Sequence, residues 1–237
     1  MLGSVLPFTE DVADRVGEYC ETRSTQIPDA LRKHWEYTRG KFSDADKMSS
    51  RLQGAWMIFT AKDRKPKRVL EIGCFSGYSA LAWYEGTKDT QAEIVTLELS
   101  PKMIVASRKA FQEYGVEDRV KLIEGPADQT LKTLTGEFDL IFVDANKDGY
   151  ENYVKTILDQ KLLSPTASFC ATTVLFARGL TIGPDCAPWV NDHVRQYWLN
   201  CGQALDGFNT RLVQDPRVHV IVLPVFDGVS QIKWKES

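Results

Sequence analysis

Residues 69–79, with the sequence VLEIGCFSGYS, combine a carboxylate and two glycines in a spacing suited to ligand binding. Glu71 lies in a short apolar run, and Gly73 and Gly77 follow it four residues apart, as expected where a strand stops at a turn close to a ligand. The spacing differs from the Gly-x-Gly-x-x-Gly of dinucleotide-binding loops and from the Gly-x-x-x-x-Gly-Lys of phosphate loops. Because the loop has no basic residue to meet phosphates, its carboxylate favours a ligand with a cationic or hydroxyl-rich part.

Acidic residues recur where the next predicted strands end. Glu98 comes about one βα unit later, Asp128 follows the third strand within Gly125-Pro126-Ala127-Asp128, and Asp144 ends the fourth. In an open parallel sheet, ligands bind at the carboxyl ends of the strands, and an acid at the position of Glu98 suits a bidentate contact with ribose hydroxyls. Taken singly, these residues are equally well interpreted as turn glycines and helix caps. Their recurrence at consecutive strand ends favours a binding site.

The elements that must position these residues alternate between strand and helix from residue 68 onward. Apolar runs predict strands at 68–73, 92–98, 119–124, 138–144, 167–175 and 218–225, and helical periods follow each of the first five. Such alternation implies a mostly parallel sheet with helices on both faces. Asp227-Gly228 then predicts the turn of an antiparallel hairpin whose second strand covers 229–234.

Before residue 68 the sequence predicts three helices. Thr9 is a candidate cap for the first, the second begins after Pro28, and a third carries Met48, Leu52, Trp56 and Phe59. We therefore expect one domain over residues 1–237, with an N-terminal helical cap (1–67) and a core (68–237).

Composition excludes several classes of protein. The net charge of −3 over 237 residues does not favour nucleic-acid binding, and no stretch has the length and apolarity of a membrane span. The N-terminus lacks the features of a secretory signal. The five cysteines are scattered without Cys-x-x-Cys spacing, so we expect reduced thiols and a cytoplasmic protein. The three histidines do not have the spacing of metal ligands.

Four segments together resemble the class I S-adenosylmethionine-dependent methyltransferases, and more closely the caffeoyl-CoA and catechol O-methyltransferase family. They are residues 69–79, Thr96-Leu-Glu-Leu-Ser-Pro101, Phe138-Asp-Leu-Ile-Phe-Val-Asp-Ala-Asn-Lys147, and the end with Asp215-Pro-Arg-Val218 and Leu223-Pro-Val-Phe-Asp-Gly228. The resemblance runs from about Met48 to Trp234. It implies a Rossmann-like, doubly wound, mostly parallel seven-stranded sheet with an antiparallel C-terminal hairpin strand and extra N-terminal helices.

The resemblance also assigns a cofactor site to this chain. It implies that S-adenosylmethionine is contacted by Met48, Ser50, Glu71, Gly73, Phe75, Ser79, Glu98, Ala127 and Asp144. In that assignment Glu71 lies near the amino group of the cofactor, Ser79 binds its carboxylate and Glu98 its ribose. Ala127 lies next to the adenine, and Asp144 faces the sulfonium. S-adenosylhomocysteine is the implied product.

The sequence departs from the family at the divalent-metal site. The family has an Asp at the end of the fourth strand and an Asp-Asn pair at the end of the fifth, whereas this chain keeps Asp144 but has Thr172-Thr173 for the pair. Magnesium prefers oxygen ligands that include carboxylates, and two neutral hydroxyls make a weak site. We therefore expect no metal requirement.

Without a metal to activate a vicinal diol, the acceptor needs a base or must already be nucleophilic. Lys147 matches the general base proposed in the family, but it serves as a base only if burial lowers its pKa. Otherwise it orients an anionic acceptor, such as a carboxylate or an acidic phenol. Candidates for the acceptor pocket are Leu175, Phe176, Arg178 and Trp189. The pattern favours a solvated loop residue for Arg178, and packing residues for Trp189, Tyr197 and Trp198.

The sequence thus predicts an S-adenosylmethionine-dependent O-methyltransferase that acts on a small-molecule hydroxyl or carboxylate, in specialised metabolism and without a metal. The alternative is a cofactor-binding protein that has lost methyl transfer. An NAD-dependent oxidoreductase is disfavoured by the glycine spacing and the terminal hairpin. The resemblance implies a homodimer, and we expect no nucleic-acid or membrane partner.

Overall fold

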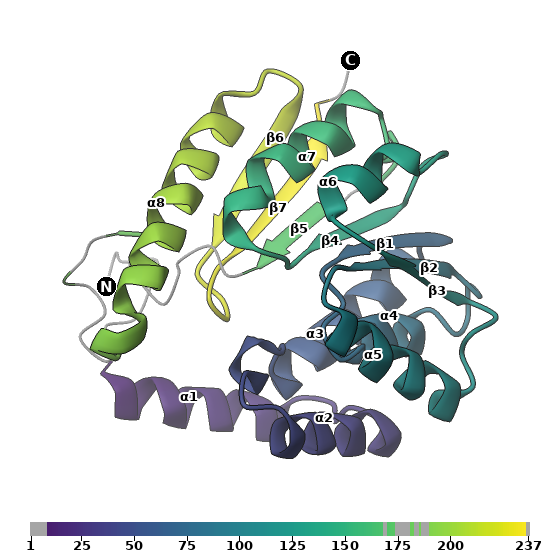
Figure 1. Ribbon diagram of the computed structural model, residues 1–237, viewed down its shortest axis with the longest axis vertical. Coiled ribbons are helices and arrows are strands. Elements are labelled where there is room, and N and C mark those ends of the chain that lie inside the picture. The colour runs from purple at the N-terminus through teal and green to yellow at the C-terminus, as the bar shows by residue number, and fades with distance from the viewer. Residues whose placement is uncertain (1–8, 168–169, 174–180, 183–184, 186–189, 236–237) are drawn as a thin grey trace.

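A seven-stranded sheet forms the centre of the molecule (Figure 1). The computed structural model describes residues 9–167, 170–173, 181–182, 185 and 190–235. The strand order is β3-β2-β1-β4-β5-β7-β6, and β1 to β5 pair in parallel. The strands are β1 (Arg68–Ile72), β2 (Glu93–Glu98), β3 (Val120–Glu124), β4 (Leu140–Val143), β5 (Cys170–Thr173), β6 (Val218–Leu223) and β7 (Val229–Trp234).

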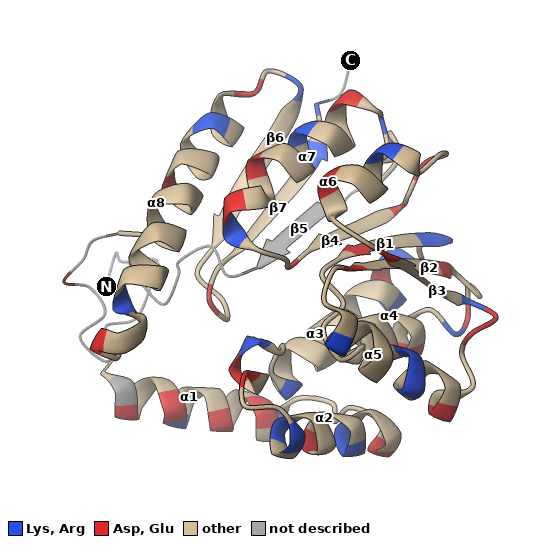
Figure 2. Cartoon of the chain, viewed as in Figure 1, with Lys and Arg blue, Asp and Glu red and all other residues tan. Residues whose placement is uncertain are grey.

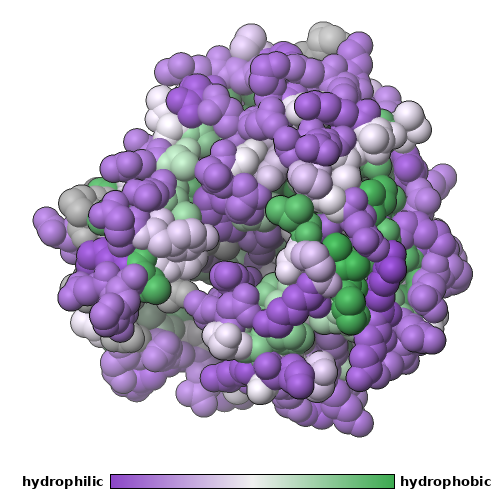
Figure 3. All heavy atoms as spheres, in the orientation of Figure 1, coloured by the Kyte–Doolittle hydropathy of each residue, from purple (hydrophilic) through white to green (hydrophobic). Residues whose placement is uncertain are grey.

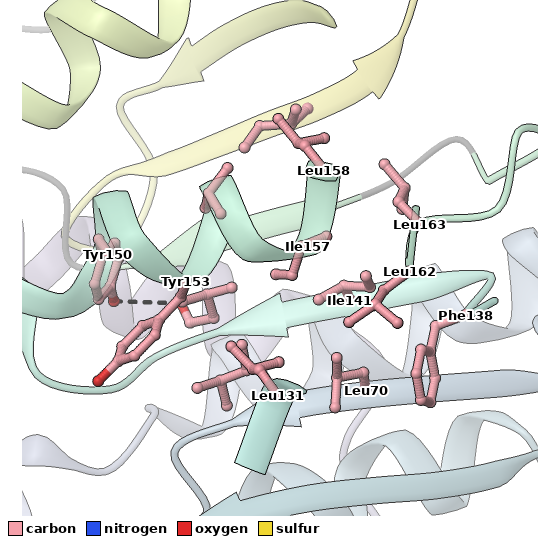
Figure 4. Packing of buried hydrophobic residues seen from close by; sticks show 14 of the residues in the cluster. Leu70, Leu131, Phe138, Ile141, Tyr150, Tyr153, Ile157, Leu158, Leu162 and Leu163 are labelled. Carbon is pink, nitrogen blue, oxygen red and sulfur yellow. Dashed lines mark hydrogen bonds between the residues drawn. The ribbon is translucent and has the colours of Figure 1, made fainter. Parts of the chain in front are cut away.

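Helices cover both faces of the sheet. Side chains along β1 alternate between two hydrophobic clusters, because successive residues of a strand point to opposite faces: Leu70 and Ile72 belong to one cluster and Val69 to the other. Figure 4 shows Leu70, Ile141 and Ile157 in the first cluster, which α7 and α8 complete. The helices are α1 (Glu10–Arg23), α2 (Asp29–Lys41), α3 (Arg51–Arg64), α4 (Tyr78–Gly86), α5 (Pro101–Tyr114), α6 (Ala127–Thr130), α7 (Tyr150–Asp159) and α8 (Asp192–Gln214), with short 3₁₀ turns η1 (Ala45–Lys47), η2 (Leu131–Thr133) and η3 (Lys147–Gly149).

The predicted C-terminal hairpin is confirmed, with β7 antiparallel to both β5 and β6. Its turn places Phe226 and Gly228 at positive φ, 57° and 94°, which explains the glycine. Val229 lies opposite Thr173 at the end of β5. The turn between β6 and β7 therefore lies at the edge of the sheet where the parallel strands end.

The prediction for the third helix is wrong in its start and its face. Met48 precedes α3, which begins after the capping residue Ser50. The buried face of α3 includes Gly54, Met57 and Ala61, whereas the predicted Phe59 is 72% exposed. Gly54 explains why this face of α3 is buried. A β-carbon at residue 54 would overlap the Tyr78 hydroxyl, so the glycine leaves room for α4 to pack closely here.

Charged side chains of both signs are interspersed along the outer helices in Figure 2. This is the pattern of solvated helix surfaces, and it contrasts with the single-sign stripe of a nucleic-acid-binding helix. Of the helices that the structure describes, none has the length and apolarity to cross a bilayer.

Candidate active site

The glycine loop between β1 and α4 is shaped by two positive-φ glycines. Gly73 has φ 98°, and a β-carbon there would overlap the backbone carbonyl of Asp144 at the end of β4. Gly77 has φ 91° and caps α4. Between them Phe75 also has a positive φ, 50°. The loop therefore turns sharply against the end of β4, which only glycine permits at residue 73.

Glu71 is a fully buried carboxylate, and only one of its two oxygens has a hydrogen-bond partner among the described residues. Its Oε2 accepts a hydrogen bond of 2.5 Å from the Thr96 hydroxyl, while Oε1 has no hydrogen-bond partner within the described chain. Burial raises the pKa of Glu71 to about 8, and the neighbouring hydroxyls of Ser79 and Thr96 offset only part of this effect. A buried oxygen without a donor is costly, so this position fits a cationic donor such as an amino group.

Glu98 is held by backbone N–H groups from two elements. Its Oε2 accepts from the amides of Cys74 (3.2 Å) and Phe75 (2.7 Å), and its Oε1 from those of Leu99 (2.9 Å) and Ser100 (2.8 Å). The carboxylate thereby ties the glycine loop to the start of α5. Since a carboxylate offers about four acceptor positions, a ribose at Glu98 would have to share them with these amides. The ribose contact stays a prediction.

Asp144 and Lys147 form a largely buried ion pair next to the loop. Lys147 Nζ lies 3.0 Å from Asp144 Oδ1 and donates to the Tyr150 hydroxyl at 3.0 Å. Tyr150, labelled in Figure 4, lies on α7. Its own hydroxyl donates to the Val143 carbonyl at 3.2 Å. Burial alone would lower the pKa of Lys147, but the Tyr150 hydroxyl and the Asp144 carboxylate outweigh it and the pKa is raised. This direction favours the ammonium form of Lys147, and its role toward the acceptor stays a prediction.

A hollow of about 280 Å³, open solvent included, lies where these groups meet. Figure 3 shows the molecule hollowed near its centre, between α8 and the N-terminal helices. Five of the predicted cofactor residues line it together with their neighbours: Lys47, Met48, Ser49, Gly73, Cys74, Phe75, Ser76, Tyr78, Ser79 and Asp144.

Four predicted cofactor residues do not line this hollow: Glu71, which is fully buried, and Ser50, Ala127 and Glu98. The Ser50 hydroxyl caps α3 by accepting from the Gln53 amide at 3.1 Å. Ala127 is half-buried at the start of α6, against the hydrophobic cluster on that face. Glu98 accepts hydrogen bonds from the backbone amides of Cys74 and Phe75 in the glycine loop. Ser49, which was not predicted as a cofactor residue, lines the hollow.

The acceptor side of the site is only partly described. The predicted residues of the acceptor pocket lie outside the described residues: Leu175, Phe176, Arg178 and Trp189. Thr172 is in register with Val143, so the backbone of the two threonines lies beside the end of β4. Two side chains of α8, Tyr197 and Cys201, lie close enough to Lys147 for its charge to affect their pKa values. Tyr197 was predicted to be a packing residue, because its helical pattern carries no signal of a contact with Lys147.

Metal-binding side chains are not clustered in the described part of the chain. In residues 9–167, 170–173, 181–182, 185 and 190–235, no group of three or more His, Cys, Asp or Glu is placed to hold a metal ion. Asp144, the carboxylate kept from the family site, is already paired with Lys147.

Comparison with known proteins decides the family. The O-methyltransferase family model matches residues 21–235. The chain belongs to this family. It is 38% identical to the O-methyltransferase ankF of Aspergillus thermomutatus over 100% of both chains, and 31% identical to the caffeoyl-CoA O-methyltransferase 1 of Eucalyptus globulus over 75% of this chain and 71% of that one. The predicted family resemblance is confirmed, and the chain is an S-adenosylmethionine-dependent O-methyltransferase.

A similar protein of known structure contains S-adenosylhomocysteine. The S-adenosylhomocysteine-bound methyltransferase PaMTH1 of Podospora anserina is 74% identical, with a TM-score of 0.97, over 99% of this chain and 100% of that one. The contacts of Glu71, Gly73 and Met48 with such a cofactor stay predictions for this chain.

Proposed function

We propose that this O-methyltransferase methylates an anionic oxygen of a small molecule, a carboxylate or an acidic phenol, without a divalent metal. The observation that carries the proposal is the Lys147 ammonium, held 3.0 Å from Asp144 and 3.0 Å from Tyr150. An ammonium has three donors, and these two bonds use two of them. The third is available to an acceptor oxygen.

We further propose which residues of the chain contact each part of S-adenosylmethionine. Glu71 would hold the amino group, Ser79 the carboxylate, and Met48 would cover the methionine part. Glu98 and Ala127 would lie at the ribose and adenine. The cofactor, when bound, supplies a methyl group on a positively charged sulfur, which an acceptor oxygen displaces in line. The contribution of the chain is alignment of the two reactants at the strand ends.

A metal fits the described residues poorly. Asp144 supplies one negative charge, and the Lys147 ammonium already neutralises it within a pair whose side chains are 9% and 13% exposed. Thr172-Thr173 add no charge. A cation of high charge density needs carboxylate ligands, so we infer that acceptor activation does not use one here.

The acceptor class follows from the charge of Lys147. A cationic side chain stabilises an oxyanion by a charge-assisted hydrogen bond, but it cannot remove a proton from a neutral alcohol. A carboxylate, or a phenol acidic enough to ionise near neutral pH, arrives in the reactive form. We place the reaction in specialised metabolism, as the family of small-molecule enzymes implies.

The test is release of S-adenosylhomocysteine with aromatic carboxylic acids, acidic and ordinary monophenols, and catechols, with magnesium and with a chelator. We expect turnover of the anionic acceptors in both conditions. Lys147→Met should lower kcat/KM by about two orders of magnitude, and Lys147→Arg by less, because it keeps the charge. Full activity of Lys147→Met would contradict the role of Lys147, and tight cofactor binding without any turnover would favour a protein that has lost methyl transfer.

We also propose that the enzyme is a homodimer. Val12, Val16 and Tyr19 form an exposed apolar stripe on α1, and Ile221 and Val222 are 54% and 41% exposed on β6 at the edge of the sheet. An apolar edge strand is a surface that a second copy commonly covers.

A further inference from the structure

We propose that helix α2 sets the spacing of the two walls of the cofactor hollow, and that Thr38 is a positioning residue for cofactor binding. One wall is the glycine loop at Gly73–Ser76, and the other is the segment Lys47–Ser49 before α3. Neither wall belongs to α2, and α2 supplies no residue to the lining. The inference rests on the proposed cofactor site, and it concerns the helix behind that site.

The contact with the glycine loop is made at Ser76, which is 1% exposed. The hydroxyl of Thr38, which is fully buried, donates to the Ser76 hydroxyl at 3.1 Å. His34 Nε2 lies 3.0 Å from the Ser76 carbonyl, and because a carbonyl can only accept, the His34 ring must donate through Nε2. Both groups of Ser76 are thus fixed by one helix, from positions four residues apart on the same face.

The same helix reaches the other wall. Trp35 Nε1 donates to the Ser49 carbonyl at 3.1 Å, and the Ser76 hydroxyl in turn lies 4.0 Å from Met48 Sδ. At the end of α2, Phe42 packs edge-on against Phe75, with ring centroids 6.1 Å apart. Contacts at Ser49, Phe75 and Ser76 therefore connect α2 to both sides of the hollow.

These contacts matter because the loop is not held by regular secondary structure. Phe75 and Gly77 have positive φ on either side of Ser76, so no helical or strand ladder fixes this residue. The Glu98 carboxylate holds the amides of Cys74 and Phe75, and α2 holds Ser76. Loss of the Thr38 hydroxyl would leave a buried Ser76 hydroxyl without its donor, which favours other loop conformations.

The experiment measures S-adenosylhomocysteine binding by calorimetry, which needs no acceptor and so is independent of the acceptor proposal. Thr38→Val keeps the shape of the side chain and removes the hydroxyl. We expect about tenfold weaker binding, the size of one buried hydrogen bond, and recovery in Thr38→Ser. In a Ser76→Ala background, Thr38→Val should have little further effect, because the two residues act through one contact.

Thr87→Val is the matched control. Thr87 is equally buried, and its hydroxyl donates to the Trp83 carbonyl at 2.8 Å at the far end of α4. It should lower Tm without changing the affinity. Unchanged affinity in Thr38→Val, or effects of Thr38→Val and Ser76→Ala that simply add, would overturn the proposal. If Thr38→Val does not fold, Trp35→Phe tests the other wall: it removes one N–H donor, and unchanged affinity there would equally overturn it.

Discussion

The buried carboxylate of Glu71 should make the stability of the cofactor-free enzyme depend on pH in a way that Glu71→Gln removes. Glu71 is fully buried, and burial raises its pKa from an ordinary value of 4.5 to about 8. Gln keeps the shape and can still accept from Thr96. Comparison with the variant therefore separates the effect of Glu71 ionisation from that of the other titratable groups of the protein.

The sign follows from linkage. Because the pKa is higher in the folded state, the contribution of Glu71 to stability is fully present below about pH 4.5 and is lost as pH rises toward about 8. Each tenfold difference between the acid dissociation constants of Glu71 in the folded and unfolded states corresponds to about 1.4 kcal/mol. The free energy of unfolding therefore falls by about 3 to 4 kcal/mol between pH 5 and pH 8. For a domain of this size, that corresponds to roughly 10 °C in Tm.

The assay is thermal unfolding of both proteins without ligand, from pH 5 to pH 8. Over this pH interval we expect the free energy of unfolding to fall by about 3 to 4 kcal/mol more in the wild type than in Glu71→Gln. S-adenosylhomocysteine should bind the wild type more tightly at pH 8 than at pH 6, because its amino group pairs with the ionised carboxylate, and this dependence should shrink in the variant. Parallel unfolding curves for the two proteins would refute the assignment of a buried, protonated Glu71.

Other perturbations follow from single contacts. Gly73→Ala should weaken S-adenosylhomocysteine binding at least about tenfold, since its β-carbon overlaps the Asp144 carbonyl at a positive φ; calorimetry that shows wild-type affinity would contradict this reading. Glu98→Gln should destabilise the fold by about 1 to 3 kcal/mol in denaturant unfolding, because the amide group of Gln brings an N–H toward backbone donors. Sedimentation should show a wild-type dimer and an Ile221→Lys monomer, and a monomeric wild type would remove the dimer proposal.

Most of the fold could be predicted from the sequence because its signals are local. Apolar runs fixed the strands to within a few residues, as at β2, predicted at 92–98 and found at Glu93–Glu98. Asp227-Gly228 marked the hairpin turn, and Gly228 indeed has a positive φ. The buried face of α3 was mispredicted because it depends on where α4 approaches, which is set by the small side chain of Gly54 and not by hydrophobic periodicity.

The site was less predictable where its properties depend on neighbours distant in sequence. The motif located Glu71 and Gly73, but the raised pKa of Glu71 depends on complete burial in the folded sheet. The raised pKa of Lys147 depends on Asp144 and Tyr150, which lie next to it only in the fold. The contact of Thr38 with Ser76 joins residues 38 positions apart, for which the sequence has no pattern.

The central claim is methyl transfer to an anionic acceptor without a metal, and transfer by metal-free enzyme tests it most directly. The protein would be treated with a chelator, its metal content checked by mass spectrometry, and the enzyme mixed in a single turnover with trideuteromethyl-labelled S-adenosylmethionine and the best acceptor of the panel. We predict labelled product at a rate that added magnesium does not change. Product that forms only after magnesium is restored would contradict the account.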